Sequence, residues 1–376
     1  MKWLLLAGSV AACGQSQHGA RGTAGAAGST PVGESGTAGT VTVTAAGASG
    51  DGGTPGSGGV AGTTSGHAGA TASAGRGGSA VIVETGGQGG DGGAADGDQT
   101  RALSYAQWPM PNPASAGLPH PASYDTSTAG IVHDNVTGLE WQRAVPPKMN
   151  WSAATAYCAE LSLAGKSDWR LPSRIELVSL VDSTRVDPSI DVNAFPDTPT
   201  DMFLTLTRGT GVGANNVREV SFAYGKTDWT SESYQAATRC VRADPLNGSP
   251  QPRYAVTAET VLDTGTGLVW ERVLDFDSAA FFTFDEAPAH CDALTLGGYA
   301  AWRVPSIKEL QTLAFEGKLN PAIDPQAFPS ATPEAYDYWS SSAHPERPGW
   351  AFNVRFSDGT SESIPSDLGE RVLCVH

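Results

Sequence analysis

Two stretches of this chain decide its fold: DNVTGLEWQR at residues 134–143 and DTGTGLVWER at residues 263–272. Six of their ten positions are identical, including the Thr-Gly step and the tryptophan. A second pair, DWRLPSRIEL at 168–177 and AWRVPSIKEL at 301–310, again shares six positions of ten. Agreement in two separate blocks indicates an internal duplication rather than similar composition. We therefore expect two copies of one domain.

The cysteines follow the same duplication. Cys158 and Cys240 are 82 residues apart, and Cys291 and Cys374 are 83 apart. The fifth cysteine, Cys13, lies near the N-terminus and outside both copies. In an exported protein an oxidising compartment allows paired cysteines to form disulfides. The sequence therefore predicts one disulfide within each copy.

The N-terminus indicates export. Lys2 precedes a short apolar run, and small residues precede Cys13, as in a bacterial lipoprotein signal peptide. The run is too short to span a bilayer. We expect cleavage after Ala12 and acylation of Cys13, which would anchor the protein on a membrane. A plain secretory signal, with Cys13 as a bystander, is the alternative.

The rest of the chain divides by composition. Residues 14–100 contain no Phe, Trp or Tyr and are rich in Gly, Ala, Ser and Thr, so they cannot offset the entropy of ordering. The expected organisation is a signal peptide (1–12), a disordered linker (13–100), a Pro-rich lead-in (101–123), domain 1 (124–243), a linker (244–253) and domain 2 (254–376).

Each copy is expected to contain two helices. Ala154, Cys158 and Leu161 are spaced by four and three residues, which predicts a helix with its cysteine facing the core. Ser173 and Glu176 form a Ser-x-x-Glu capping box, which predicts the start of a second helix. The second copy has the counterparts Ala287, Cys291, Leu294, Ser306 and Glu309.

Short strands complete each copy. The Leu-x-Trp step after the Thr-Gly turn is typical of a strand. Phe352, Val354 and Phe356 alternate with polar residues before a Ser-Asp-Gly-Thr turn, which predicts a hairpin. The last strand is expected at 372–375, matching 238–241. The disulfide would then tie the first helix to the last strand.

The order of these motifs resembles the Lcl C-terminal domain family, named for a collagen-like bacterial adhesin and long described as a domain of unknown function. The motifs are Thr-Gly-Leu-x-Trp, Ala-x-x-Tyr-Cys-x-x-Leu, Trp-Arg-Leu-Pro-Ser-x-x-Glu-Leu, Tyr-Trp-Ser-Ser-Ser and Arg-Cys-Val-Arg. The resemblance covers about residues 124–243 and 254–376. It implies an α+β fold of two tandem C-type lectin-like domains with small antiparallel sheets. The first copy departs from the pattern, with FLT at 203–205 where WSS stands at 339–341.

Charge and motif content exclude several functions. Residues 101–376 carry a net charge of −13 of the total −16, which disfavours nucleic acid as a partner. The seven histidines show no metal-binding spacing, so no metal site or cofactor is predicted, and His290 is interpreted as a helix-surface residue. The Glu-Pro-Asn, Gln-Pro-Asp and Trp-Asn-Asp tripeptides of calcium-dependent lectins are absent from the sequence. No catalytic motif occurs either, so we expect a protein that is not an enzyme.

Surface recognition remains as the expected role, because aromatic faces stack on sugar rings while amide and guanidinium groups fix orientation. The candidate ligand-binding residues are Trp339, Arg347, Trp350, Asn353, Arg355 and Asp358. The opposing interpretation places Trp339 in the core and the polar residues in solvated loops.

We expect an adhesin-like protein of the bacterial cell envelope, at the outer membrane or cell surface, that binds a glycan or a surface protein. An envelope-assembly protein without a small-molecule site, or an enzyme resembling formylglycine-generating enzymes, are the alternatives.

Overall fold

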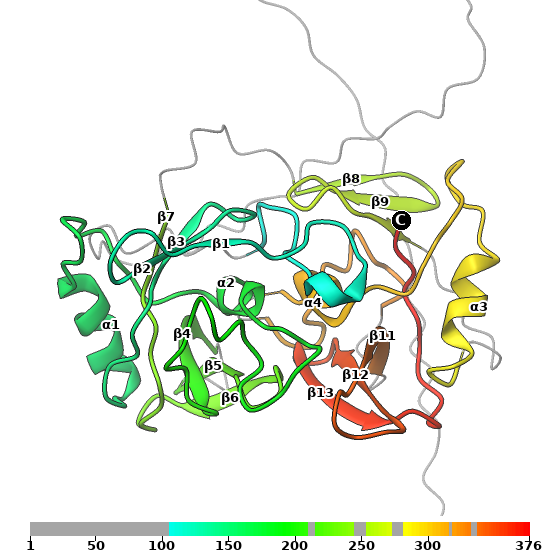
Figure 1. Cartoon of the computed structure of the whole chain (residues 1–376). Helices are drawn as coiled ribbons and strands as arrows, with labels where there is room; N and C mark the ends of the chain where they lie inside the picture. The colour runs from blue at the N-terminus through cyan, green and yellow to red at the C-terminus, as the bar shows by residue number, and fades with distance from the viewer. Residues whose placement is uncertain (1–104, 210–214, 244–252, 273–280, 316–317, 332–336) are drawn as a thin grey trace, which may run out of the picture. The chain divides into compact units, whose positions relative to one another are not determined.

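The structure is a computed structural model, and it describes residues 105–209, 215–243, 253–272, 281–315, 318–331 and 337–376 (Figure 1). All of these residues belong to one compact unit of the chain. The expected signal peptide over 1–12, Cys13, the expected linker over 13–100 and most of the expected linker over 244–253 lie outside the described residues.

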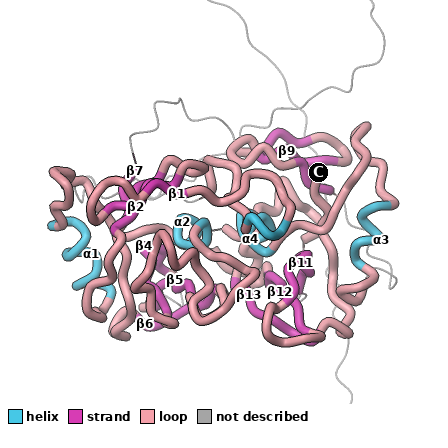
Figure 2. The backbone as a smooth tube through the Cα atoms, in the orientation of Figure 1, coloured by secondary structure: helices cyan, strands magenta, loops and turns pink. Residues whose placement is uncertain are grey.

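Both copies consist of short helices and strands joined by long loops (Figure 2). The first copy contains β1 (Tyr124–Asp125), β2 (Ile131–Asp134), β3 (Leu139–Gln142), α1 (Trp151–Glu160), α2 (Arg174–Ser179), β4 (Met202–Arg208), β5 (Asn216–Ser221), β6 (Thr227–Ser231) and β7 (Val241–Ala243). The second contains β8 (Tyr254–Val256), β9 (Thr260–Asp263), β10 (Val269–Glu271), α3 (Ala287–Asp292), α4 (Ile307–Thr312), β11 (Asp337–Ala343), β12 (Trp350–Arg355) and β13 (Thr360–Pro365). A short 3-10 helix, Ala114–Ala116, precedes β1.

The duplicated DxxTG stretch forms the same turn in both copies. The Asp134 carboxylate accepts hydrogen bonds from the backbone N–H groups two and three residues later, at 2.9 and 3.3 Å. Asp263 does so at 3.0 and 3.4 Å. Gly138 and Gly267 then adopt φ values of 72° and 77°, which favour glycine. The turn leads into β3 or β10, as predicted.

The predicted capping boxes are confirmed, and they explain why an arginine recurs before each of them. Ser173 accepts from the backbone N–H of Glu176, whose carboxylate accepts from the N–H of Ser173 at 2.8 Å. Arg170 then holds the same carboxylate with two hydrogen bonds of 2.7 and 2.5 Å. Arg303 and Glu309 repeat this clamp at 2.7 and 2.8 Å. Each repeated Trp-Arg-x-Pro-Ser-x-x-Glu motif therefore fixes the start of a helix.

One of the three sheets in the described part of the chain runs across the duplication. One sheet has the order β1-β2-β3-β7, a second has β10-β9-β8, and a six-stranded sheet has β11-β12-β13-β6-β5-β4. The junction is the antiparallel pairing of Thr227 on β6 with Ser361 on β13, two equivalent positions 134 residues apart. The two copies thus share one sheet, with α2 and α4 side by side against it (Figure 1).

Buried cations also join the copies. Arg174, at the start of α2, donates to the carbonyl oxygens of Gln311 and Ala314 at 3.0 and 3.1 Å, at the end of α4. Lys308, near the start of α4, donates to the carbonyl oxygen of Ser179 at 2.7 Å, at the end of α2. Carbonyls in a last helical turn lack partners within the helix and favour cations. Each copy therefore caps the helix of the other.

A third cation reaches from the first copy into a turn of the second. Arg218 on β5 donates to the carbonyl oxygen of Asp358, between β12 and β13. Gly359 follows with φ 71°, and a Cβ there would lie 2.6 Å from the Arg218 guanidinium. The predicted Ser-Asp-Gly-Thr hairpin turn is thus also part of the junction, and its glycine is needed for the close approach.

The Pro-rich lead-in contacts both copies. Trp108 and Met110 belong to the hydrophobic core of the first copy. Asn112 is buried, and its side-chain oxygen accepts a 3.1 Å hydrogen bond from Ser306, the residue that caps α4. Residues 105–112 are therefore structural parts of the two-copy body.

Two details differ from the sequence alignment. Leu204, not Phe203, occupies the position of Trp339, because Thr205 and Ser340 make the same bond to the carbonyl of the adjacent strand, at 2.8 and 2.7 Å. The expected last strand, 372–375, is an extended segment with isolated bridges at Val375, where the first copy forms β7. The first difference is a shift of one residue between the sequence alignment and the structure at β4 and β11.

Candidate functional site

Each copy is closed by a disulfide, as predicted. The sulfur atoms of Cys158 and Cys240 are 2.02 Å apart, and those of Cys291 and Cys374 are 2.06 Å apart. The bonds tie α1 to the residue before β7, and α3 to the C-terminal segment. All four cysteines are buried. They are therefore crosslinks of the folded domains.

Two of the candidate ligand-binding residues lie inside the protein. Trp339 is 0% exposed, and its indole N–H donates to the carbonyl oxygen of Phe282 at 2.8 Å. Asn353 is also buried and donates to the carboxylate of Asp337 at 3.0 Å. Their side chains hold β11 and β12 in place, as the opposing interpretation of the sequence expected for Trp339.

Two more candidates form contacts within the second copy. Arg355 bridges Asp337 and Glu362 at 2.9 and 3.0 Å, which raises the pKa of the guanidinium. The Asp358 carboxylate accepts from the hydroxyl and N–H of Thr360 at 2.7 and 3.0 Å and stabilises the hairpin turn. Both side chains are partly exposed, but each has partners within the protein.

Arg347, in the loop between β11 and β12, forms a cation–aromatic pair with Trp350, the first residue of β12. The guanidinium carbon lies 5.3 Å from the centre of the indole ring. Arg347 is exposed and Trp350 is half-buried, while a 3.0 Å backbone hydrogen bond between them shapes the turn. Nearby, the buried His344 packs between Phe352 and Tyr224, with ring centres 5.5 and 5.9 Å apart. This loop therefore presents a supported, solvent-facing aromatic and cationic surface.

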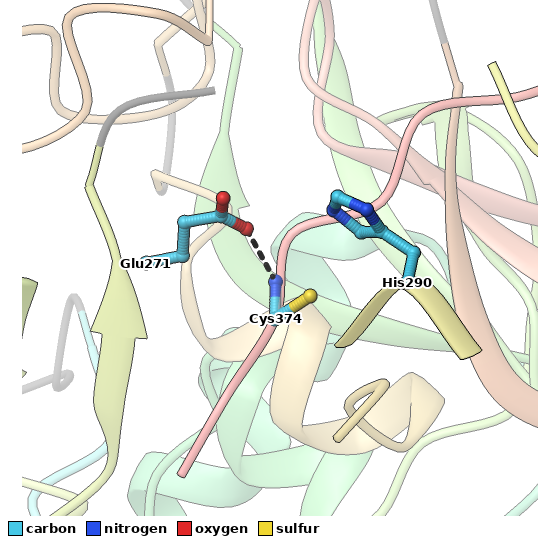
Figure 3. A group of neighbouring side chains, drawn as sticks. All are labelled: Glu271, His290 and Cys374. Atoms are coloured by element: carbon cyan, nitrogen blue, oxygen red, sulfur yellow. Dashed lines mark hydrogen bonds between the residues drawn. The ribbon is translucent and has the colours of Figure 1, made fainter. Parts of the chain in front are cut away.

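A second group of side chains has the chemistry of a metal site. Glu271 on β10, His290 on α3 and Cys374 each offer one ligand atom, and these atoms lie within 4.8 Å of one another (Figure 3). The backbone N–H of Cys374 donates to the Glu271 carboxylate at 3.2 Å. Burial raises the pKa of Glu271 to about 7 and lowers the pKa of His290. In this structure the Cys374 sulfur is part of a disulfide and is not a thiolate.

The first copy places neutral side chains at the same positions. Gln142 corresponds to Glu271, because the backbone N–H groups of both donate to the carbonyl of the last cysteine, at 2.9 and 3.0 Å. Tyr157 corresponds to His290, since each directly precedes the helix cysteine. Gln142 donates to the Tyr157 hydroxyl at 2.8 Å. The duplicated position is thus ionisable in one copy and neutral in the other.

The sequence interpretation missed this group. His290 was expected on the helix surface, but it is half-buried and its ring stacks on Phe282 with centres 4.4 Å apart. A comparison of the two copies could have found it, because the first copy has Gln142 and Tyr157 where the second has Glu271 and His290. Histidine spacing within one helix could not reveal ligands that come from three separate segments.

The comparisons follow the duplication. A family model described as the Lcl C-terminal domain matches residues 130–242 and 259–376. Comparison with curated proteins finds no match. Within the described part of the chain, no helix has both the length and the apolar character needed to cross a membrane. The two matched segments cover more than half of the chain and coincide with the two disulfide-closed copies, so this chain belongs to the Lcl C-terminal domain family.

Proposed function

We propose that this protein is a lipid-anchored, extracytoplasmic binding protein of the adhesin-like kind, in which two lectin-like domains present one recognition surface. Membership of a family named for an adhesin supports a role at the cell surface. The small residues before Cys13 support lipid anchoring at that cysteine, and the linker over 13–100 would hold the domains away from the membrane. The C-type lectin-like fold is part of this proposal.

The observation that carries the proposal is the Arg347–Trp350 pair. An aromatic face beside a guanidinium is suited to sugars, because the ring covers the C–H face while the donors bind hydroxyl groups. The buried His344 and the strand pairing of Trp350 with Pro365 support the loop from below. Such support reduces the entropy lost when a ligand orders the side chains.

The two copies differ at the position of Trp350, although the first copy has a cation–aromatic pair elsewhere, with the Arg208 guanidinium carbon 4.7 Å from the Trp151 ring centre. Asn216 occupies the β5 position that corresponds to Trp350 on β12, since it pairs with Ser231 as Trp350 pairs with Pro365. The first copy therefore lacks this tryptophan. Residues 210–214, which correspond to part of the loop, lie outside the described residues. We assign recognition to the second copy and a supporting role to the first.

Charge selects the ligand class. The net charge of −13 over residues 101–376 repels polyanions, and Glu346 lies next to Arg347. A neutral glycan is therefore favoured over a sulfated polysaccharide. The joined cysteine pairs support a binding role instead of an enzyme that needs free thiols, and no catalytic residue or cofactor is assigned.

The test is a glycan array probed with the full chain, followed by titration of each hit. Trp350→Ala should weaken binding at least tenfold, and Arg347→Gln should weaken it severalfold. Tyr234→Ala is the matched control, because Tyr234 is an aromatic residue of the first copy that is 45% exposed. Binding to a surface protein but to no glycan would show that the ligand is a protein instead of a glycan. Silence with both glycans and cell-surface extracts would overturn the proposal.

The anchor is tested separately. Metabolic labelling with an alkyne fatty acid should tag the wild-type chain and leave Cys13→Ser untagged. The variant should also leave the membrane fraction. Equal labelling of both proteins would place the lipid elsewhere, and no labelling would support a plain secretory signal.

A further inference from the structure

Three potential zinc ligands meet beside the disulfide of the second copy. Glu271, His290 and Cys374 provide an oxygen, a nitrogen and a sulfur within 4.8 Å of one another (Figure 3). Cys291 is the disulfide partner of Cys374, with the two sulfurs 2.06 Å apart, and its sulfur is a fourth potential ligand that lies outside this 4.8 Å group. Thiolate, imidazole and carboxylate are the ligand types of four-coordinate zinc sites.

Oxidation state decides whether these atoms bind metal. The disulfide sulfurs carry no thiolate charge, and thiolates are the sulfur ligands of zinc. Reduction frees the two sulfurs to move apart toward the roughly 3.7 Å separation that two thiolates adopt around one zinc ion, given Zn–S bonds of about 2.3 Å. The imidazole and carboxylate already lie within the same small volume.

The other two side chains each have a ligand atom that accepts no hydrogen bond from another described residue. His290 makes no side-chain hydrogen bond to another described residue, and stacking on Phe282 fixes its ring plane. One oxygen of Glu271 accepts from the N–H of Cys374, and no other described residue donates to the second oxygen.

The first copy shows what the same framework looks like without metal ligands. Gln142 donates to the hydroxyl of Tyr157 at 2.8 Å, which satisfies both groups internally. The amide of Gln142 also accepts the N–H of Cys240 at 3.4 Å, as Glu271 accepts that of Cys374. The second copy replaces both neutral groups by zinc-ligating groups on an otherwise equivalent backbone. Because the two replaced side chains lie next to each other in space, their joint change to zinc-ligating groups points to a bound metal.

We propose that the second copy contains a latent zinc site, formed by Cys291, Cys374, His290 and Glu271 when the disulfide between the two cysteines is reduced. A dithiol reductant supplies two electrons and two protons, so that the S–S bond becomes two thiols and the reductant becomes a disulfide. Zinc then displaces the two thiol protons and binds two thiolates, the neutral imidazole and the carboxylate. A disulfide oxidant that takes up the two electrons, and itself becomes a dithiol, would release the metal and restore the crosslink.

The site would give the two copies different responses to reduction. In the second copy zinc would keep α3 tied to the C-terminal segment, as the disulfide does. In the first copy the amide of Gln142 and the phenol of Tyr157 stand at the positions of Glu271 and His290, and neither is a usual zinc ligand. The second copy, which carries the proposed recognition loop, would therefore stay closed under reducing conditions.

The experiment uses the full chain with Cys13→Ser, which removes the unpaired thiol. The protein is reduced with a phosphine and titrated with Co²⁺, which reports tetrahedral thiolate ligation through its visible absorption bands. One Co²⁺ per chain is expected, displaced by Zn²⁺, and none before reduction. A double variant with Glu271→Gln and His290→Tyr, which installs the residues of the first copy, should weaken binding at least a hundredfold. The reciprocal Gln142→Glu with Tyr157→His should create a second site.

A second measurement, alkylation of the cysteines, tests the site even if reduction loosens the fold. Zinc should protect Cys291 and Cys374 from alkylation at least tenfold while leaving Cys158 and Cys240 reactive, as read by peptide mass spectrometry. Absence of both the cobalt bands and selective protection would overturn the proposal, whether or not the reduced chain stays folded. Equal protection of all four cysteines, or unchanged binding in the double variant, would also overturn it.

Discussion

The ammonium group of Lys308 donates a 2.7 Å hydrogen bond to the carbonyl oxygen of Ser179, and both residues are buried between the two copies. Burial lowers the pKa of Lys308 to about 7 from 10.5. The folded chain therefore binds fewer protons than the unfolded chain between these pH values, and this group makes the folded state more stable as pH rises. Below pH 7 the group is charged in both states, and the burial penalty is fully present.

Lys308→Met should remove that dependence. The wild-type chain is expected to gain stability between pH 7 and pH 9 relative to the variant, measured as the difference in free energy of unfolding by urea. Arg303→Met is a control, because Arg303 forms a partly exposed ion pair within one copy. Identical pH profiles for the wild-type and Lys308→Met chains would contradict the prediction.

Arg174→Ala should destabilise both copies together. The guanidinium donates to two carbonyls at the end of α4, and its removal leaves buried acceptors unsatisfied. The free energy of unfolding is expected to fall by about 2–4 kcal/mol. Because the six-stranded sheet crosses the junction, the chain should still unfold in one transition, seen alike by tryptophan fluorescence and far-UV circular dichroism. Two separate transitions in the wild-type chain would show that the copies fold independently.

Glu271→Gln should stabilise the chain at pH 8. The residue is 5% exposed, and burial raises the carboxyl pKa to about 7 from 4.5. The folded state then binds more protons, so stability from this group is present below pH 4.5 and is lost as pH rises through 7. The substitution should add up to about 3 kcal/mol at pH 8 and little at pH 4. Gln142→Glu in the first copy is the reciprocal control and should destabilise at pH 8; a stabilising effect would argue against this interpretation.

The two disulfides should contribute equally. They close loops of 82 and 83 residues, so the chain-entropy account assigns each roughly 4–5 kcal/mol. Cys158→Ala with Cys240→Ala, and Cys291→Ala with Cys374→Ala, should lower the free energy of unfolding by similar amounts in metal-free buffer. A large difference between the two double variants would show that native packing, rather than loop closure, dominates one of them.

Local signals predicted most of the framework correctly. Ser173 and Ser306 cap their helices because both partners of each capping box lie three residues apart, within reach in any such chain. Gly138 and Gly267 mark turns for the same local reason. The sequence alignment was one residue out at Trp339, because the offset between the copies changes from 133 at Phe195 and Phe328 to 135 at Thr205 and Ser340 and no short pattern marks that change.

The candidate site was only partly predictable. Arg347 and Trp350 could be chosen by residue type, and the structure places them together at the surface. Trp339 and Asn353 have the same residue chemistry but lie inside, since strand alternation does not show which face a neighbouring segment covers. Glu271 and His290 come from different elements, so neither suggested the other.

The sequence by itself determined the duplication, the cysteine pairs, the turns and the helix starts, because each depends on residues that are near neighbours or on identity between the copies. The tertiary structure alone decided that β6 joins β13, that Arg174 and Lys308 cap each other's helices, and that Glu271 and His290 meet beside a disulfide. These contacts join segments that are mostly far apart in the chain. A charged residue in a short helix looks like a surface residue until the fold shows what covers it.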